Sequence, residues 1–226
     1  MDPPAKAPPT DAPQKDAPRN ARPDGHQPSA GRRPASITLF LLVTLVVLAA
    51  DLGLKTYAFN SVAGSPVVLD PAIPNTMGVP YHDPFVLIPN VLHLQLTANT
   101  GAIFGMGKGS RWIFIVVSIV AVGFIGRVFW RSPAQAKILH TALALILAGA
   151  LGNLYDRFCF AAVRDMLHMF PGIDLPWNLT WPGGARGLYP WIFNIADVAL
   201  LFGVLTVVWF TWKNAPPPPT AETTQD

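Results

Sequence analysis

Four long runs of apolar residues, separated by more polar stretches, dominate the pattern of the sequence. The runs cover residues 35–58, 112–130, 138–156 and 191–212. A helix needs about 20 apolar residues to cross the hydrocarbon core of a bilayer, and each run is close to that length. Trp or Tyr stands at most of their ends, which is typical of side chains at a membrane interface. The pattern predicts four membrane-spanning helices within one domain, residues 35–213.

The stretches outside the predicted spans form two long loops and two tails. The loops, residues 60–111 and 157–190, are rich in Pro, Gly and aromatic residues. Residues 86–97 partly alternate apolar and polar side chains, which indicates β-structure. We therefore expect an all-α membrane protein with four transmembrane helices and a small β-containing subdomain on the membrane surface. Residues 1–34 and 214–226 are tails rich in Pro, and their composition predicts disorder.

Basic residues indicate how the chain is oriented in the membrane. Four spans place both tails on one side. Lys and Arg flank the spans on that side, with no acid close beside them: Arg32, Arg33, Arg127, Arg131, Lys137 and Lys213. An excess of Lys and Arg is typical of cytoplasmic segments. We therefore expect both termini in the cytoplasm and both long loops on the outer face.

Composition narrows the class of protein. Of the 226 residues, 51% are hydrophobic and 13% are charged, and an average soluble domain has about 25% charged residues. The composition therefore favours a membrane protein over a soluble enzyme. The net charge of +3 is too small to indicate binding to nucleic acid. The single cysteine, Cys159, excludes an internal disulfide and a metal site built from several cysteines.

Ionisable side chains at the outer ends of the predicted spans are the strongest functional candidates. A charge inside a membrane is costly, so its presence usually marks a function. Asp51 and Lys55 are four residues apart and share a helix face, on which they can pair. Asp156 and Arg157 lie at the end of the third run.

Further polar residues fall at the same depth. Asn194 and Asp197 lie on one face of the fourth run, with Asp197 on the order of 10 Å below its start at 1.5 Å rise per residue. Asp165 lies in the second long loop, and Asn99 lies in the first. A proton path would place polar residues at several depths. Their common depth instead predicts one site in the outer third of the membrane.

Each of these residues also has a structural interpretation. The pair in the first run could be an ion pair that locks two helices together, and the pair at the end of the third run could be an ordinary helix-end pair. Asn99 and Asn194 could supply hydrogen bonds between helices. Asp197 is the hardest to explain in this way, because an unpaired carboxylate in a span costs about 2.5–3.5 kcal/mol.

Five short motifs follow one another along the chain in an order that matches one known pattern. They are D-x-x-x-K (Asp51 to Lys55), N-x-G-A-x-F (Asn99 to Phe104), G-N-x-x-D-R (Gly152 to Arg157), V-x-D (Val163 to Asp165) and F-N-x-A-D (Phe193 to Asp197). In this arrangement the chain resembles lipoprotein signal peptidase (signal peptidase II), a family of four-span aspartic proteases of the bacterial inner membrane. Two features depart from the family: Met166 stands where Phe is common, and residues 177–189 lengthen the second loop.

The resemblance implies a role for each matching residue. Asp165 and Asp197 would form the catalytic pair. A second group would bind substrate or support that pair: Asp51, Lys55, Asn99, Gly101, Asn153, Asp156, Arg157 and Asn194. The substrate would be a prolipoprotein, cleaved just before a diacylglyceryl-modified cysteine.

The resemblance also implies a cellular setting. The chain would act as a monomer in the bacterial inner membrane, with its site near the outer face and no metal or organic cofactor. Its partners would be lipidated prolipoproteins and membrane lipid, and not nucleic acid. Residues 177–189 are too short and too rich in Pro and Gly to span, so we expect them to lie over the membrane surface near the site.

Two other classes of function compete with this interpretation. A small membrane transporter or a proton- or ion-coupled protein could use the same acids, although their common depth argues against it. A metal-dependent transferase acting on lipid headgroups would need closely spaced Asp residues on one helix, and the sequence has no such cluster.

Overall fold

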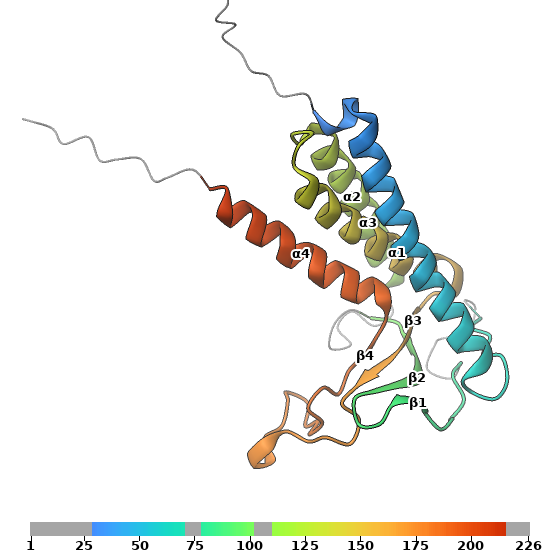
Figure 1. Cartoon of the computed structure of the whole chain (residues 1–226). Coiled ribbons are helices and arrows are strands. Elements are labelled where there is room, and N and C mark those ends of the chain that lie inside the picture. The colour runs from blue at the N-terminus through green and yellow to red at the C-terminus, as the bar shows by residue number, and fades with distance from the viewer. Residues whose placement is uncertain (1–28, 71–77, 102–109, 216–226) are drawn as a thin grey trace, which may run out of the picture.

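The computed structural model of the chain describes residues 29–70, 78–101 and 110–215. Its long helices are α1 (Pro34–Ser61), α2 (Arg111–Arg131), α3 (Lys137–Phe160) and α4 (Ile195–Lys213), and all four are long and apolar enough to cross a membrane. The four predicted spans are therefore confirmed as helices. The start of α1 and the end of α4 lie at the end of the bundle remote from the sheet (Figure 1).

Helix α3 is the centre of the bundle. In its most apolar stretch of 18 residues, 50% of the residues are buried, compared with 17% in the corresponding stretch of each of the other three helices. Small residues let α3 and α4 approach closely: a Cβ added to Gly203 would lie 2.8 Å from the carbonyl oxygen of Ala142. Close backbone contact through small residues is the usual way in which helices pack in lipid.

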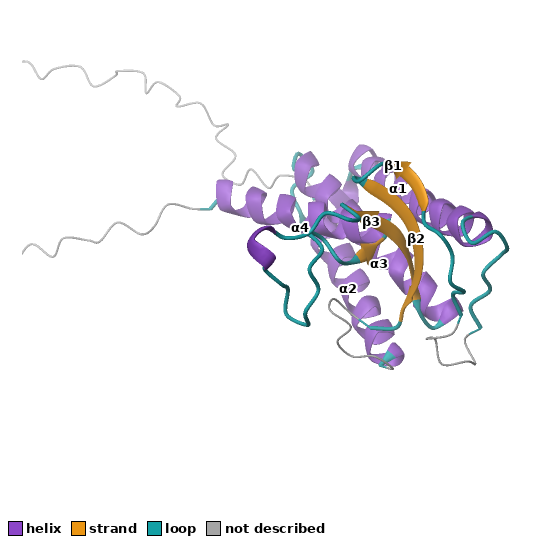
Figure 2. Ribbon diagram, turned by 90° about the horizontal axis from the view of Figure 1, so that it is seen from below, coloured by secondary structure: helices purple, strands orange, loops and turns teal. Residues whose placement is uncertain are grey.

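A small antiparallel sheet covers one end of the bundle. Its strands are β1 (Phe85–Ile88), β2 (Leu92–Asn99), β3 (Val163–Met169) and β4 (Ile192–Phe193), paired in that order. The β-structure predicted for residues 86–97 is therefore confirmed. Figure 2 looks onto this sheet, with the helices behind it.

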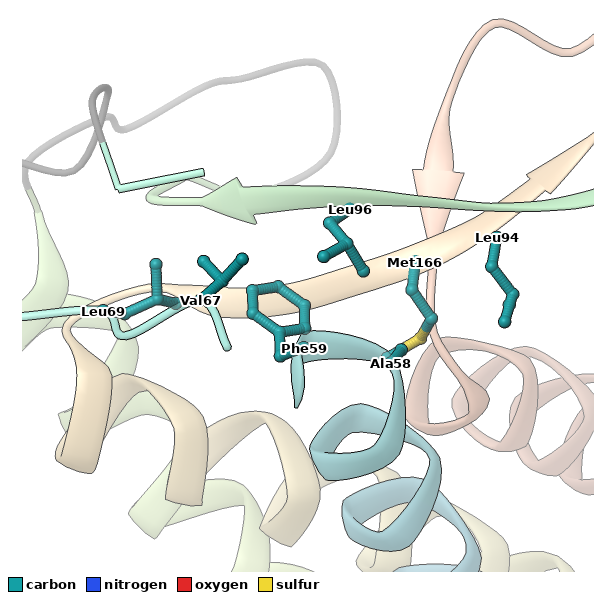
Figure 3. Packing of buried hydrophobic residues seen from close by; sticks show 7 residues of the cluster. All are labelled: Ala58, Phe59, Val67, Leu69, Leu94, Leu96 and Met166. Atoms are coloured by element: carbon teal, nitrogen blue, oxygen red, sulfur yellow. The ribbon is translucent and has the colours of Figure 1, made fainter. Parts of the chain in front are cut away.

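An apolar cluster joins the sheet to the end of α1 (Figure 3). Buried side chains from α1, from the segment after it and from two strands make up the cluster: Ala58, Phe59, Val67, Leu69, Leu94, Leu96 and Met166. Met166 is fully buried there, so this flexible side chain fills the place next to Asp165 on β3. The cluster fixes β3 relative to the helices.

The start of α4 differs from the sequence prediction. The apolar run begins at residue 191, but residues 192–193 pair with β3 as a strand, and Asn194 has extended backbone as the N-cap of α4. Asp197 therefore lies in the first turn of α4 and not deep within a span. The apolar pattern could not separate these residues from the helix, because a short buried strand and a helix segment look alike in sequence.

Residues 30–33, which by composition belong to the predicted tail, are part of the fold. They form a short 3-10 turn, η1 (Ala30–Arg32), and Ala30 is fully buried. Its backbone N–H donates to the carbonyl oxygen of Ser132, 2.8 Å away. Gly31 lies so close to the ring of Trp130 that a Cβ would overlap it, so small residues allow this contact. Residues 1–28 and 216–226 of the predicted tails lie outside the described residues.

Candidate active site

The sheet and the start of α4 bring the two predicted catalytic aspartates to the same amide side chain. Asp165 lies on β3 and is buried, and Asp197 lies half-buried in the first turn of α4. The Nδ2 of Asn194 donates to Oδ1 of Asp165 at 2.5 Å. Its Oδ1 accepts from the backbone N–H of Asp197 at 3.0 Å, while Oδ2 of Asp197 accepts from the backbone N–H of Asn194 at 3.3 Å. This reciprocal pair is a capping box, and it fixes Asp197 as the helix begins.

Two further amides orient the carboxylates. The Nδ2 of Asn153, on α3, donates to Oδ1 of Asp197 at 2.8 Å. Its Oδ1 accepts from Asn194, with 3.2 Å between the oxygen and Nδ2. The Nδ2 of Asn99, at the end of β2, donates to Oδ2 of Asp165 at 3.1 Å, and its Oδ1 accepts from the N–H of Gly101 at 3.0 Å. Three asparagines from three elements therefore hold the two carboxylates in place.

The surroundings of Asp165 favour its protonated form. Burial, followed by the negative charge of Asp197, raises the pKa of Asp165 to about 7, although hydrogen bonds from Asn99 and Asn194 act in the opposite direction. Burial and the same two carboxylates also raise the pKa of Tyr189, which places this residue within electrostatic range of the pair. The sequence predicts that residues 177–189 lie near the site but does not single out Tyr189 as a neighbour of the carboxylates.

A buried ionic network lies beside the carboxylates. Nζ of Lys55 is 2.7 Å from Oδ2 of Asp51 and 3.1 Å from Oδ2 of Asp156, and it donates to Oδ1 of Asn153 at 3.2 Å. Oδ1 of Asp51 accepts from the backbone N–H of Ala196 at 2.9 Å. The predicted pairing of Asp51 with Lys55 is confirmed. It ties α1 to α3 and to the first turn of α4.

The expected pairing of Asp156 with Arg157 is wrong. Oδ1 of Asp156 accepts from Nε and Nη2 of Arg164 at 3.0 and 2.8 Å, and Oδ2 accepts from the backbone N–H of Arg164 at 2.9 Å. Consecutive residues on a helix do not face each other, so Asp156 and Arg157 diverge. The chain reverses after α3 at Ala161, whose φ is 59°, and this brings Arg164 back to Asp156. No signal in the sequence identified Arg164.

Arg157 contacts the opposite side of the site. Its Nη2 donates to the carbonyl oxygen of Gly101 at 3.3 Å, and its Nη1 donates to that of Asn153 at 3.4 Å. The guanidinium also lies over the ring of Phe114, 5.0 Å from the centroid. Arg157 therefore holds the segment that follows Asn99 in the sequence. The remainder of that motif, including Ala102 and Phe104, lies outside the described residues.

A cavity of about 460 Å³ opens beside Asp165. Its walls come from residues 79–82, from β2 and from Ile192, and they include Asn99. The ring of His82 closes one side, since its Nε2 accepts from the backbone N–H of Leu96 at 3.0 Å. The described residues contain no group of three or more His, Cys, Asp or Glu side chains that could hold a metal ion.

The lengthened loop is anchored to the sheet by aromatic contacts. The ring of Trp191 lies 4.7 Å from that of Trp181 and 5.3 Å from that of Tyr189, and Tyr189 also contacts Phe193 on β4. At the start of the loop Trp177 is 88% exposed. Tyr189 thus lies near the carboxylates, as expected of this loop, and its position over the membrane surface stays a prediction.

Comparison with known proteins identifies the family. A family model described as signal peptidase (SPase) II matches residues 43–213. A lipoprotein signal peptidase of Latilactobacillus sakei subsp. sakei (strain 23K) is 33% identical over 169 residues, which are 75% of this chain and 90% of that protein. One from Methylorubrum extorquens (strain PA1) is 34% identical over 128 residues, 55% of this chain and 66% of its own.

Solved structures support the fold independently. A bacterial membrane enzyme determined by the in meso method at 2.3 Å resolution superposes with a TM-score of 0.58 at 22% identity, over 84% of this chain and 94% of that one. A second such structure, at 1.9 Å, has the same TM-score at 23% identity and is covered over 98% of its length. The order of the motifs, the family match and the helical fold agree. The chain belongs to the signal peptidase II family and is a multi-pass membrane protease that removes signal peptides from lipoproteins.

Proposed function

We propose that the protein is an aspartic endopeptidase in which Asp165 and Asp197 act together on the peptide bond before a diacylglyceryl-modified cysteine. The observation that carries this proposal is that Asn194 donates to both carboxylates, from its side-chain Nδ2 to Asp165 and from its backbone N–H to Asp197. Peptide hydrolysis needs one group that takes a proton from water and another that gives a proton to the leaving amine. Two neighbouring carboxyl groups that share a proton supply both functions.

The environments of the two residues support a division of labour. Asp165 is buried, and its raised pKa of about 7 lets it hold a proton at neutral pH. Asp197 is half-buried and accepts hydrogen bonds at both oxygens. In the proposed reaction Asp197 takes a proton from water as the water oxygen bonds to the scissile carbonyl carbon. Asp165 gives its proton to the amide nitrogen as the C–N bond breaks.

The position of the pair suits a substrate anchored by lipid. Both carboxylates lie where the apolar helices meet the small sheet, so a diacylglyceryl group among the helices would hold the following peptide bond at that level. The cavity beside Asp165 would receive the polypeptide. In this proposal the protein acts on lipidated prolipoproteins as a monomer within membrane lipid. Neither a metal nor an organic cofactor enters the reaction.

The charge distribution supports a topology with both termini in the cytoplasm of a bacterial inner membrane. Arg33 before α1, Arg131 at the end of α2 and Lys213 at the end of α4 lie at the end of the bundle remote from the sheet, and this supports a site at the outer face. Single cysteines at Ser65 and Ala185, with Cys159 replaced by Ser, should react with an impermeant reagent in whole cells whose outer membrane has been permeabilised. Protection of both positions would overturn this topology.

The catalytic proposal is tested by a gel-shift assay on a lipidated precursor in detergent, with a chelator present. Asp165→Asn and Asp197→Asn should each abolish cleavage, because Asn keeps the size of the side chain but exchanges no proton. The double variant should be hardly worse than either single variant, since the two act as a unit. Asp174→Asn, in the lengthened loop, is the matched control and should cleave normally. Substantial cleavage by well-folded Asp197→Asn would overturn the aspartic mechanism.

A further inference from the structure

The end of the bundle remote from the sheet carries charge of one sign. Six basic residues lie there among the described residues: Arg32, Arg33, Arg127, Arg131, Lys137 and Lys213. The first turns of α1 and α3 contain no acid, and none of the ion pairs in the described part of the chain includes any of these six. Within the described residues, this end of the protein therefore presents a positive surface without compensating acids.

A cavity of about 340 Å³ lies within this surface, between the start of α1 and the connection from α2 to α3. Arg33 and Lys137 line it from opposite elements, together with Ser36, Gln135 and Leu39. Its volume falls within the roughly 300–1,000 Å³ of typical ligand pockets. At 1.5 Å per residue, Ser36 is about 22 Å along α1 from Asp51, so the cavity is remote from the carboxylates.

Hydrogen bonds between the two elements build the cavity as part of the fold. The hydroxyl of Ser36, which is only 7% exposed, donates to the carbonyl oxygen of Ala134 at 3.1 Å. Beside it, the N–H of Ala30 donates to the carbonyl oxygen of Ser132 at 2.8 Å. The segment before α1 and the connection before α3 are therefore held together by hydrogen bonds within the protein.

The walls of the cavity combine two kinds of chemistry. Arg33 and Lys137 are exposed cations with flexible stems, whereas Ala35 and Leu39 are apolar. The neighbouring outward surfaces of the two helices are apolar as well: Leu42 on α1 is 58% exposed and Ile138 on α3 is 50% exposed. An occupant should therefore carry an anionic group joined to hydrocarbon that can lie along these helices.

We propose that this cavity binds the headgroup of an anionic phospholipid. The phosphate would lie between the guanidinium of Arg33 and the ammonium of Lys137, and the acyl chains would run along α1 and α3. Basic pockets between membrane helices suit such headgroups. A zwitterionic lipid would bring its own cation and lose much of this attraction. The proposal is independent of the catalytic mechanism, because it uses none of the residues near the carboxylates.

Native mass spectrometry of the purified full chain in detergent tests the proposal, with phosphatidylglycerol and phosphatidylcholine as probes. We expect preferential binding of phosphatidylglycerol, weakened about 25-fold in Arg33→Gln/Lys137→Gln, since each cation near an anionic surface contributes about a fivefold factor. The control variant Arg127→Gln/Lys213→Gln removes the same charge from exposed positions outside the cavity and should retain the preference. Ala35→Trp, which fills the cavity without changing charge, should lose it.

Three results would overturn the proposal. The first is an equal weakening of phosphatidylglycerol binding in the cavity variant and in the control variant, which would indicate general attraction to a positive surface. The second is full binding by Ala35→Trp. The third is competition by inorganic phosphate at the same concentration as the lipid, which would indicate a site for a free anion. All three variants should cleave a lipidated precursor in neutral detergent as the unmodified chain does, which also checks their folding.

Discussion

Replacing Lys55 by Met should destabilise the protein far more than a typical substitution does. The side chain of Lys55 is fully buried, and three acceptors surround its ammonium group: Asp51, Asp156 and Asn153, at 2.7, 3.1 and 3.2 Å. An ammonium group has three N–H donors, so every donor has a partner. Met has about the same length and fills the space, which leaves the missing charge as the main change.

The magnitude follows from what the two carboxylates retain. Asp156 keeps three hydrogen bonds from Arg164, but Asp51 keeps only that from the N–H of Ala196. Asp51 is 1% exposed, so water cannot replace the lost cation. Removing one partner of a buried ion pair costs about 3–5 kcal/mol. Most of this cost should come from the charge on Asp51, so Lys55→Met/Asp51→Asn should recover more than half of it.

Thermal unfolding in a fixed detergent, followed by tryptophan fluorescence, measures these differences. Lys213→Met is the matched control, because Lys213 is exposed at the end of α4, and its substitution should change the free energy of unfolding by less than about 0.5 kcal/mol. A loss below about 1 kcal/mol in Lys55→Met would refute the reasoning. So would a double variant no more stable than the single one, since the penalty would then not arise from Asp51.

Three further predictions concern the site and its surroundings. The pKa of Asp165 is raised from 3.8 to about 7, so folding binds a proton at this residue, and its contribution to stability falls as the pH rises through that interval. Asp165→Asn should therefore raise the melting temperature at pH 8 but not at pH 4. An equal effect at both pH values would contradict the raised pKa. Gly152→Ala should unfold the protein or lower its melting temperature sharply, because its Cβ would overlap the carboxylate of Asp51, whereas Gly123→Ala has open space and should be neutral or stabilising in the same melt. Deleting residues 179–186 should impair substrate handling, measured as a higher KM for a lipidated precursor, more than it impairs membrane insertion. Unchanged cleavage kinetics would exclude a role of this loop in substrate handling.

The main features of the fold could be predicted from the sequence because membrane spans need long apolar runs, and such runs are visible without any tertiary information. The alternation at residues 86–97 likewise predicted β-structure. The pairing of Asp51 with Lys55 could be predicted because residues four apart on a helix are neighbours.

Features that depend on where the chain turns could not be predicted. Asp156 pairs with Arg164 only because the chain reverses at Ala161, and no local pattern records that reversal. The residues before Asn194 read as part of an apolar span, whereas pairing with β3 makes them a strand. Residues 30–33 read as part of a tail by composition, and only their contact with the connection before α3 makes them structural. The roles of the individual site residues stay predictions until the variants above are measured.

The amide of Asn194 has one consequence for how the site works. Its oxygen accepts from a backbone N–H while its nitrogen donates to Asp165 and to Asn153, so a rotation of the amide by half a turn would lose all of these contacts. The asymmetry of one side chain thus selects a single orientation for the groups around both carboxylates. Donors that are fixed before substrate arrives need no reorganisation when charge moves. The folding of the first turn of α4 therefore also orders the groups around the two carboxylates that we propose as the catalytic pair.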